Sequence, residues 1–111
     1  MFTVRLGDDR SLSLRGPPIN DSAWHHVAAQ RFARTGLALF VDGQLADAIW
    51  QPLDRTSVDG TLLLWLGSEG TLDAPSAELD ELRISSTARY VRSFSPPRVL
   101  GTDEATEGYY P

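Results

Sequence analysis

Short segments that alternate between apolar and polar residues, separated by turn-forming residues, constrain this fold more than any other feature of the sequence. Residues 2–6 (FTVRL) and 11–14 (SLSL) alternate in this way, and the glycine and aspartates between them predict a hairpin turn. Asp42-Gly43 lies between expected strands at residues 37–41 and 44–46, the second extending toward Trp50, and predicts a two-residue hairpin. No segment carries the apolar stripe of an amphipathic helix. We therefore expect an all-β fold.

Three further strands are expected at residues 24–31, 61–66 and 78–84. Segment 61–66 is apolar throughout, which is typical of a strand buried on both faces, whereas segment 78–84 places Leu82 and Ile84 on one face. Residues 85–92 are compatible with a helical turn that begins after Ser86. Short strands at regular spacing, with turn residues between them, predict an antiparallel β-sandwich or jelly roll.

The 111 residues are enough for one domain, which we place at residues 1–100. Residues 101–111 are acidic, poor in apolar side chains and preceded by a Pro-Pro break, so we expect a loose C-terminal tail there. The longest apolar runs are much too short to span a bilayer, which argues against a membrane partner.

Charge and cysteine content exclude several classes of function. The chain has 10 basic residues, all of them arginine, against 15 acidic ones, and its formal charge is −5. This balance repels phosphates and argues against a nucleic-acid partner. Cysteine does not occur, which excludes a disulfide framework, a thiol nucleophile and a cysteine-ligated zinc.

Three segments, in this order, are similar to one known family. They are DSAWHHVA at residues 21–28, LALFVDG at residues 37–43, and LG at residues 66–67 followed by ELDELRI at residues 78–84. Together they resemble the laminin-G-like, or concanavalin A-like lectin/glucanase, jelly-roll superfamily over about residues 21–97. The ending ARYVRSFSPP at residues 88–97 resembles that of the versions found in phage tail and bacterial surface proteins. The resemblance therefore suggests an extracellular, cell-surface or virion setting.

The same resemblance implies an incomplete jelly roll, because family members have further strands before the hairpin that lies here at residues 2–14. Either the chain comes from a longer protein, or its gene is shortened. Missing strands leave an unpaired sheet edge and a bare apolar face, so we expect a homo-oligomer, most simply a two-fold dimer. The alternative is that the tail folds back and covers the gap with Val99, Leu100, Tyr109 and Tyr110.

Several residues of the first two motifs are expected to be structural. His25 and His26 are adjacent, so on a strand they point to opposite faces and do not chelate one ion together. The resemblance implies that one of their rings packs under the sheet and the other faces a loop. It also implies a core position for Trp24, where the family buries a tryptophan. Asp42 and Gly43 are expected to form the hairpin turn.

Glu78 and Asp80 are two residues apart, and on a strand they share a face as the acid pair of a glycosidase does. The resembling glucanases carry a third carboxylate nearby, but here positions 82 and 83 are Leu82 and Arg83, and Glu81 points the other way. We therefore expect no catalytic residues and no enzyme activity. Asp80 is expected to tie down loops, and Arg83 is expected to pair with a carboxylate.

Calcium is the one cofactor that the resemblance makes possible, because relatives hold it with aspartates at the rim of the sandwich. The candidate ligands lie in predicted loops and form no dense acidic run; they are Asp42, Asp54 and Asp73. Carbohydrate recognition by a lectin-like sheet usually needs an aromatic platform with an aspartate or asparagine nearby. The candidates for such a site are Trp50, Trp65, Tyr90 and Asp59. Trp65 lies in the apolar segment and is more typical of a core residue, so Trp50 is the best exposed of them.

These expectations combine into a non-catalytic binding module that recognises a glycan or a partner protein in a virion-tail or cell-surface context. A purely structural domain for phage assembly or decoration is the first alternative. A degenerate glycoside hydrolase is the second, and the missing third carboxylate argues against it.

Overall fold

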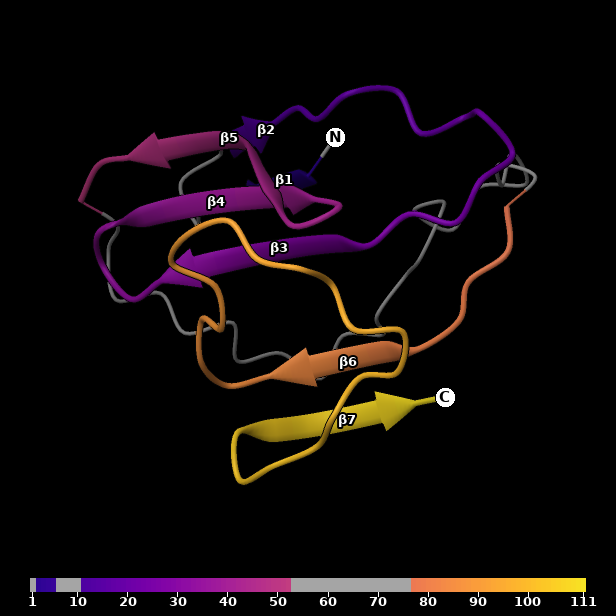
Figure 1. The fold of residues 1–111 in the computed structure, drawn as a ribbon. Coiled ribbons are helices and arrows are strands. Elements are labelled where there is room, and N and C mark those ends of the chain that lie inside the picture. The colour runs from indigo at the N-terminus through magenta and orange to yellow at the C-terminus, as the bar shows by residue number, and fades with distance from the viewer. Residues whose placement is uncertain (1, 6–10, 53–76) are drawn as a thin grey trace.

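The computed structural model describes residues 2–5, 11–52 and 77–111, and over these residues it contains strands and no helix. The strands form three antiparallel sheets, β1-β2, β3-β4-β5 and β6-β7 (Figure 1). Their bounds are β1 Phe2–Arg5, β2 Ser11–Leu14, β3 Val27–Phe32, β4 Gly36–Val41, β5 Gln44–Trp50, β6 Leu82–Ser85 and β7 Thr106–Tyr110. The all-β antiparallel fold is confirmed, and these sheets fit a partial jelly-roll sandwich.

Strand β4 is the centre of the core, and every one of its residues is buried. On one face, Leu37, Leu39 and Val41 form a cluster with Leu14 of β2. Leu14 and Leu37 have no exposed surface. Because the run GLALFV is apolar at every position after the glycine, it fits the middle of a sheet that is covered on both sides.

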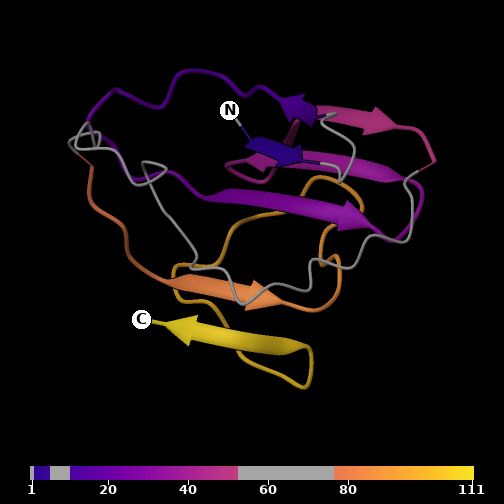
Figure 2. The same ribbon diagram turned by 180° about the vertical axis from the view of Figure 1, so that it is seen from behind.

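The second face of β4 is covered by the irregular chain that follows β6. Phe40 lies against Tyr90 and Phe94, with ring centroids 6.2 and 5.8 Å away, and these two rings stack on each other at 3.6 Å. Figures 1 and 2 show this chain crossing one side of β3 and β4, opposite the side that faces β1 and β2. The sheet β3-β4-β5 is therefore the middle layer of the described structure.

The hairpin predicted at Asp42-Gly43 is confirmed. Val41 pairs with Gln44, and the two turn residues have positive φ angles of 51° and 79°, as a type I′ turn requires. Further along this hairpin the register shifts between Leu39 and Phe40, which marks a β-bulge.

Several boundaries differ from the sequence-based expectation. Strand β3 begins at Val27 rather than at residue 24, and β6 begins at Leu82 rather than at residue 78. Glu81 has a φ of 55°, a left-handed conformation that does not continue a strand backward from β6. Residues 85–92 form no helical turn, since the backbone N–H groups of Arg89 and Tyr90 bind the side chain of Gln30 instead. The strand expected at residues 61–66 lies outside the described residues.

The expectation of a loose tail at residues 101–111 is wrong, because β7 pairs with β6. The alternative, in which the tail folds back, is met only in part: Val99 and Tyr110 remain exposed, whereas Leu100 and Tyr109 contact Glu81. Its carboxylate accepts hydrogen bonds from the backbone N–H of Leu100 and from the hydroxyl of Tyr109, both at 2.8 Å. Among the described residues, no helix is long and apolar enough to cross a membrane.

Candidate functional site

One row of residues across the middle sheet places two aromatic rings side by side. Phe32 pairs with Gly36, and Gly36 pairs with Trp50, so all three lie on the same face. A Cβ atom at Gly36 would lie only 2.7 Å from Cε3 of Trp50, which means that the indole ring lies directly over the glycine. The centroids of the Phe32 and Trp50 rings are 5.4 Å apart. We call this pair the Phe32–Trp50 platform.

The platform is open to solvent on the side of Trp50, whose residue surface is 62% exposed. Next to it lies a shallow depression of about 420 Å³, formed by the turn between β3 and β4 and by the chain just after β6. Its lining residues are Arg31, Phe32, Ala33, Thr35, Ser86, Thr87 and Ala88. The Phe32 ring belongs to both the platform and this depression, so the two form one continuous surface.

Hydroxyl groups stand beside the aromatic rings in this depression. Thr35 donates its hydroxyl hydrogen to the carbonyl of Phe32 at 2.9 Å, and Ser86 donates to the carbonyl of Ala105 at 3.3 Å. A hydroxyl that donates one hydrogen bond keeps lone pairs that accept others. The surface therefore combines apolar ring faces with fixed polar groups, which is the usual composition of a site for a small organic ligand.

The other aromatic and acidic candidates for a glycan site lie elsewhere. Tyr90 belongs to a cluster with Phe40, Phe94 and His26, and its hydroxyl accepts a hydrogen bond from Arg83 at 3.2 Å. Those contacts cover the second face of β4 and do not bring Tyr90 to the platform. Trp65 and Asp59 lie outside the described residues.

The core position expected for Trp24 is wrong, since this residue is 68% exposed. It precedes the first residue of β3, Val27, and so lies in an irregular segment rather than on the sheet. Within the described residues, no sheet face covers its ring.

His25 joins two loops through its ring. Its Nδ1 lies 2.7 Å from Oδ2 of Asp42, and its Nε2 lies 2.7 Å from Oδ1 of Asp21. These hydrogen bonds, first to Asp21 and then to Asp42, raise the pKa of His25 above its ordinary value. The same bonds to His25 lower the pKa of both carboxyl groups.

His26 occupies a different environment. Its backbone N–H donates to Oδ1 of Asp42 at 2.9 Å, while its ring meets Tyr90 and Phe94 edge-on at 5.9 and 5.5 Å. Burial, and then the charge of Arg83, lower the pKa of this imidazole, and its Nδ1 has no hydrogen-bond partner. The two histidines thus have different surroundings: the ring of His25 connects two loops, and the ring of His26 lies among aromatic rings.

The expected acid pair does not lie on a strand. Glu78 and Asp80 precede β6 and are exposed, and Asp80 accepts a hydrogen bond from the backbone N–H of Glu81 at 3.0 Å. The expectation that they share a strand face is therefore wrong. Glu81, as described above, holds Leu100 and Tyr109, and its carboxylate raises the pKa of the Tyr109 hydroxyl.

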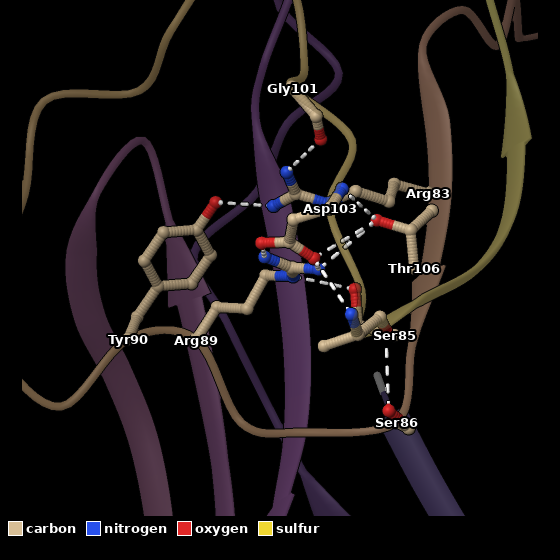
Figure 3. Close-up of polar contacts among 9 residues, drawn as sticks. Arg83, Ser85, Ser86, Arg89, Tyr90, Gly101, Asp103 and Thr106 are labelled. Carbon is tan, nitrogen blue, oxygen red and sulfur yellow. Dashed lines mark hydrogen bonds and ion pairs between the residues drawn. The ribbon is translucent and has the colours of Figure 1, made fainter.

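Arg83 differs from its expected role as the partner of a carboxylate. Its guanidinium donates to the carbonyl of Gly101 at 2.7 Å and to the Tyr90 hydroxyl (Figure 3). The arginine that binds a carboxylate in this region is Arg89, whose two terminal nitrogens each lie 2.7 Å from an oxygen of Asp103. The sequence does not predict this pair, because nothing in the spacing of the two residues indicates contact.

The calcium candidates are not brought together by the part of the chain that the structure describes. Asp42 binds His25 and the backbone of His26, and Asp54 and Asp73 lie outside the described residues. Within residues 2–5, 11–52 and 77–111, no group of three or more acidic or histidine side chains has an arrangement suited to a metal ion.

Comparison with known proteins gives a match to a family model. The family model described as "Concanavalin A-like lectin/glucanases superfamily" matches residues 1–92 of this chain. Comparisons with curated proteins and with solved structures gave no significant match. The matched range includes the platform and every residue that lines the depression beside it, and it ends before β7.

Proposed function

The chain belongs to the concanavalin A-like lectin/glucanase superfamily, and from this premise we propose that it is a non-catalytic binding module that holds a glycan at the Phe32–Trp50 platform. The observation that carries the proposal is the indole ring of Trp50, which is fixed over Gly36 beside Phe32 while most of its surface faces solvent. A ring that is already fixed loses little conformational entropy when a ligand stacks on it.

The composition of the site favours a sugar over other small ligands. Each sugar ring has an apolar face made of C–H groups, which stacks on an aromatic ring, and a rim of hydroxyls. Thr35, Ser86 and Thr87 line the depression next to Phe32 and match that rim with groups that donate and accept hydrogen bonds. These hydroxyls take the place of the acidic or amide side chain that was expected beside the platform, because this lining contains neither.

The size of the site favours a glycan over a partner protein. A stable protein interface covers about 800 Å² on each partner. The platform and its depression involve the ends of β3 and β5 and two short turns, which is a small area of this kind of surface. A virion-tail or cell-surface setting remains part of the proposal and is supported by the resemblance of the ending at residues 88–97.

A non-catalytic role is supported by how the carboxylates are used. Glu81 is engaged with Leu100 and Tyr109, and neither Glu78 nor Asp80 lies in a strand. A glycosidase holds two carboxyl groups on opposite sides of one bond at a defined separation. No such pair faces the platform among the residues that line it.

The test compares two exposed tryptophans on a glycan array. We expect the wild-type chain to bind at least one class of glycan, Trp50→Ala to lose at least about tenfold in affinity, which is ~1.4 kcal/mol, and Trp24→Ala to bind as the wild type does. Trp24 is the matched control because it is at least as exposed but lies outside the platform. A wild-type chain that binds no glycan contradicts the proposal, as does equal loss in both variants.

A further inference from the structure

The last strand of the chain lies outside the part that the family model matches. The match ends at residue 92, whereas β7 spans Thr106–Tyr110 and pairs with β6. In this register Arg83 is opposite Tyr109 and Ile84 is opposite Gly108. Figures 1 and 2 show β7 as the outermost strand of the described structure, with β6 between it and β3.

The approach to β7 is fastened by an ion pair. The guanidinium of Arg89 makes two parallel hydrogen bonds of 2.7 Å to the carboxylate of Asp103 and a third of 3.2 Å to the hydroxyl of Thr106 (Figure 3). A bidentate arginine–carboxylate pair is stronger and more directional than a single contact. It holds the pKa of Asp103 far below its usual range.

Backbone groups fasten the same segment at further points. The carbonyl of Gly101 accepts a hydrogen bond from Arg83, and the carbonyl of Ala105 accepts one from the backbone N–H of Ser86 at 2.9 Å. At the other end of β7, the Tyr109 hydroxyl donates to Glu81. The tail is therefore attached along its length to β6 and to the residues that flank it.

Strand β6 without β7 would present an edge that is suited to self-pairing. Its sequence, LRIS, contains no acidic residue and no proline. In an antiparallel pair of two β6 strands centred between positions 83 and 84, each Arg83 lies opposite the Ile84 of the other copy, so like charges do not face each other. An unprotected edge of this kind is a template for pairing with another chain.

Strand β7 presents a better protected edge. It contains the exposed Glu107 and Gly108, and it is followed by Pro111. Its pairing with β6 also has a register shift, at Ile84 and Ser85. A charge, an irregular register and a nearby proline are among the devices that keep natural sheet edges from pairing.

We propose that β7 is an intramolecular edge cap, which keeps this chain monomeric by occupying the β6 edge, and that detachment of β7 allows β6 to pair with the β6 of a second copy. The partner is thus a second copy of this chain, and the surface is the β6 edge. The inference is independent of the glycan site. It replaces the dimer expected for the intact chain with a dimer that forms only when the cap is open.

The test compares two variants of the full 111-residue chain, one with a proline inside β7 and one with a proline just before it. Tyr109→Pro removes a backbone N–H in the middle of β7 and detaches the strand. Glu104→Pro is the control, because Glu104 begins the turn before β7, at a turn position where proline is favoured. Sedimentation velocity at 5–100 µM (about the range in which weak dimers form) measures the mass.

We expect the wild type and Glu104→Pro to sediment as monomers, and Tyr109→Pro to approach twice that mass at the highest concentration. A wild-type dimer overturns the proposal, and so does a folded Tyr109→Pro that stays monomeric. If Tyr109→Pro does not fold, Asp103→Ala replaces it as the test variant. This change removes the ion pair between Arg89 and Asp103 and leaves the sequence of β7 intact. Asp103→Ala must then dimerise more than the wild type, and an unchanged monomer overturns the proposal.

Discussion

The side chain of Gln30 binds the backbone of Tyr90 on both its donor and its acceptor group. Gln30 Nε2 donates to the carbonyl of Tyr90 at 2.8 Å, and Gln30 Oε1 accepts from the N–H of Tyr90 at 2.8 Å and from that of Arg89 at 2.7 Å. The Gln30 amide thus makes the kind of hydrogen bonds to backbone that a neighbouring strand would make. It fixes the irregular segment at Arg89 and Tyr90 against the middle sheet. Residues 86–88, which line the depression, lie directly before this anchor.

The first prediction concerns this anchor. Gln30→Ala removes three part-buried hydrogen bonds to the backbone of Arg89 and Tyr90, and each such bond contributes ~0.5–1.5 kcal/mol. We expect the free energy of unfolding to fall by at least about 2 kcal/mol, as measured by urea denaturation. The control is Gln44→Ala, which removes a single 3.2 Å hydrogen bond to Ser93 at an exposed position. Equal effects of the two changes would show that Gln30 is not an anchor.

The second prediction concerns the β4–β5 turn. Gly43 has a φ of 79°, and a Cβ atom there would lie 1.8 Å from the carbonyl oxygen of Phe94. Gly43→Ala combines this backbone collision with a left-handed conformation that costs a non-glycine residue roughly 1–2 kcal/mol. We expect a fall of more than about 2 kcal/mol in the free energy of unfolding. Gly101→Ala is the control, because no atom lies within 4 Å of its added Cβ.

The third prediction concerns catalysis. We expect no release of reducing sugar from soluble β-glucans, because the carboxylate of Glu81 binds Leu100 and Tyr109 and positions 82 and 83 carry no acid. The measurement is a reducing-sugar assay with an active glucanase as the positive control. Hydrolysis of β-glucan that disappears in Glu78→Gln would contradict the prediction. It would support the interpretation that Glu78 and Asp80 form a catalytic acid pair.

The sequence was sufficient to predict the hairpin at Asp42-Gly43 but not the face on which Trp50 lies. A strict two-residue turn pairs Gly36 with Ile49, whereas the bulge beside Leu39 and Phe40 pairs Gly36 with Trp50. A shift of one residue moves a side chain to the opposite face of the sheet. The bulge therefore places Trp50 beside Phe32. No residue in the sequence predicts a bulge at this position. The sequence alone identifies Trp50 as a candidate for ligand binding, but it does not predict that Trp50 lies beside Phe32.

The tail and Trp24 show a second limit, because both depend on contacts between distant parts of the chain. Composition predicted a loose tail, since residues 101–111 contain few apolar side chains. Polar contacts hold these residues in place: the guanidinium of Arg89 binds the carboxylate of Asp103, and that of Arg83 binds the carbonyl of Gly101. Likewise, the family motif predicted a buried Trp24, but the position of the first residue of β3 decides whether a sheet covers it. Periodicity describes single strands well and carries no information on such pairings.

The neighbouring histidines provide the basis for a pH prediction, because their pKa values move in opposite directions from the ordinary 6.5. The raised pKa of His25 means that its two carboxylate contacts stabilise the fold fully below pH 6.5, and that this stabilisation is lost as pH rises through the folded pKa. The lowered pKa of His26 has the reverse effect. Its contribution is complete above pH 6.5 and is lost as pH falls toward the folded pKa, because the unfolded chain takes up the proton first.

The fourth prediction separates the two histidines by substitution. In His26→Phe, which keeps an aromatic ring against Tyr90 and Phe94, we expect the melting temperature to fall as pH rises above 6.5, because His25 is then the only histidine of the chain. In His25→Asn we expect the melting temperature to fall as pH drops below 6.5. Thermal unfolding between pH 5 and 9 (about the range in which a histidine titrates) measures both slopes, and NMR titration of the wild-type imidazoles assigns each pKa. If the His25 ring titrates at or below 6.5, the contacts with Asp21 and Asp42 do not hold His25 in its charged form.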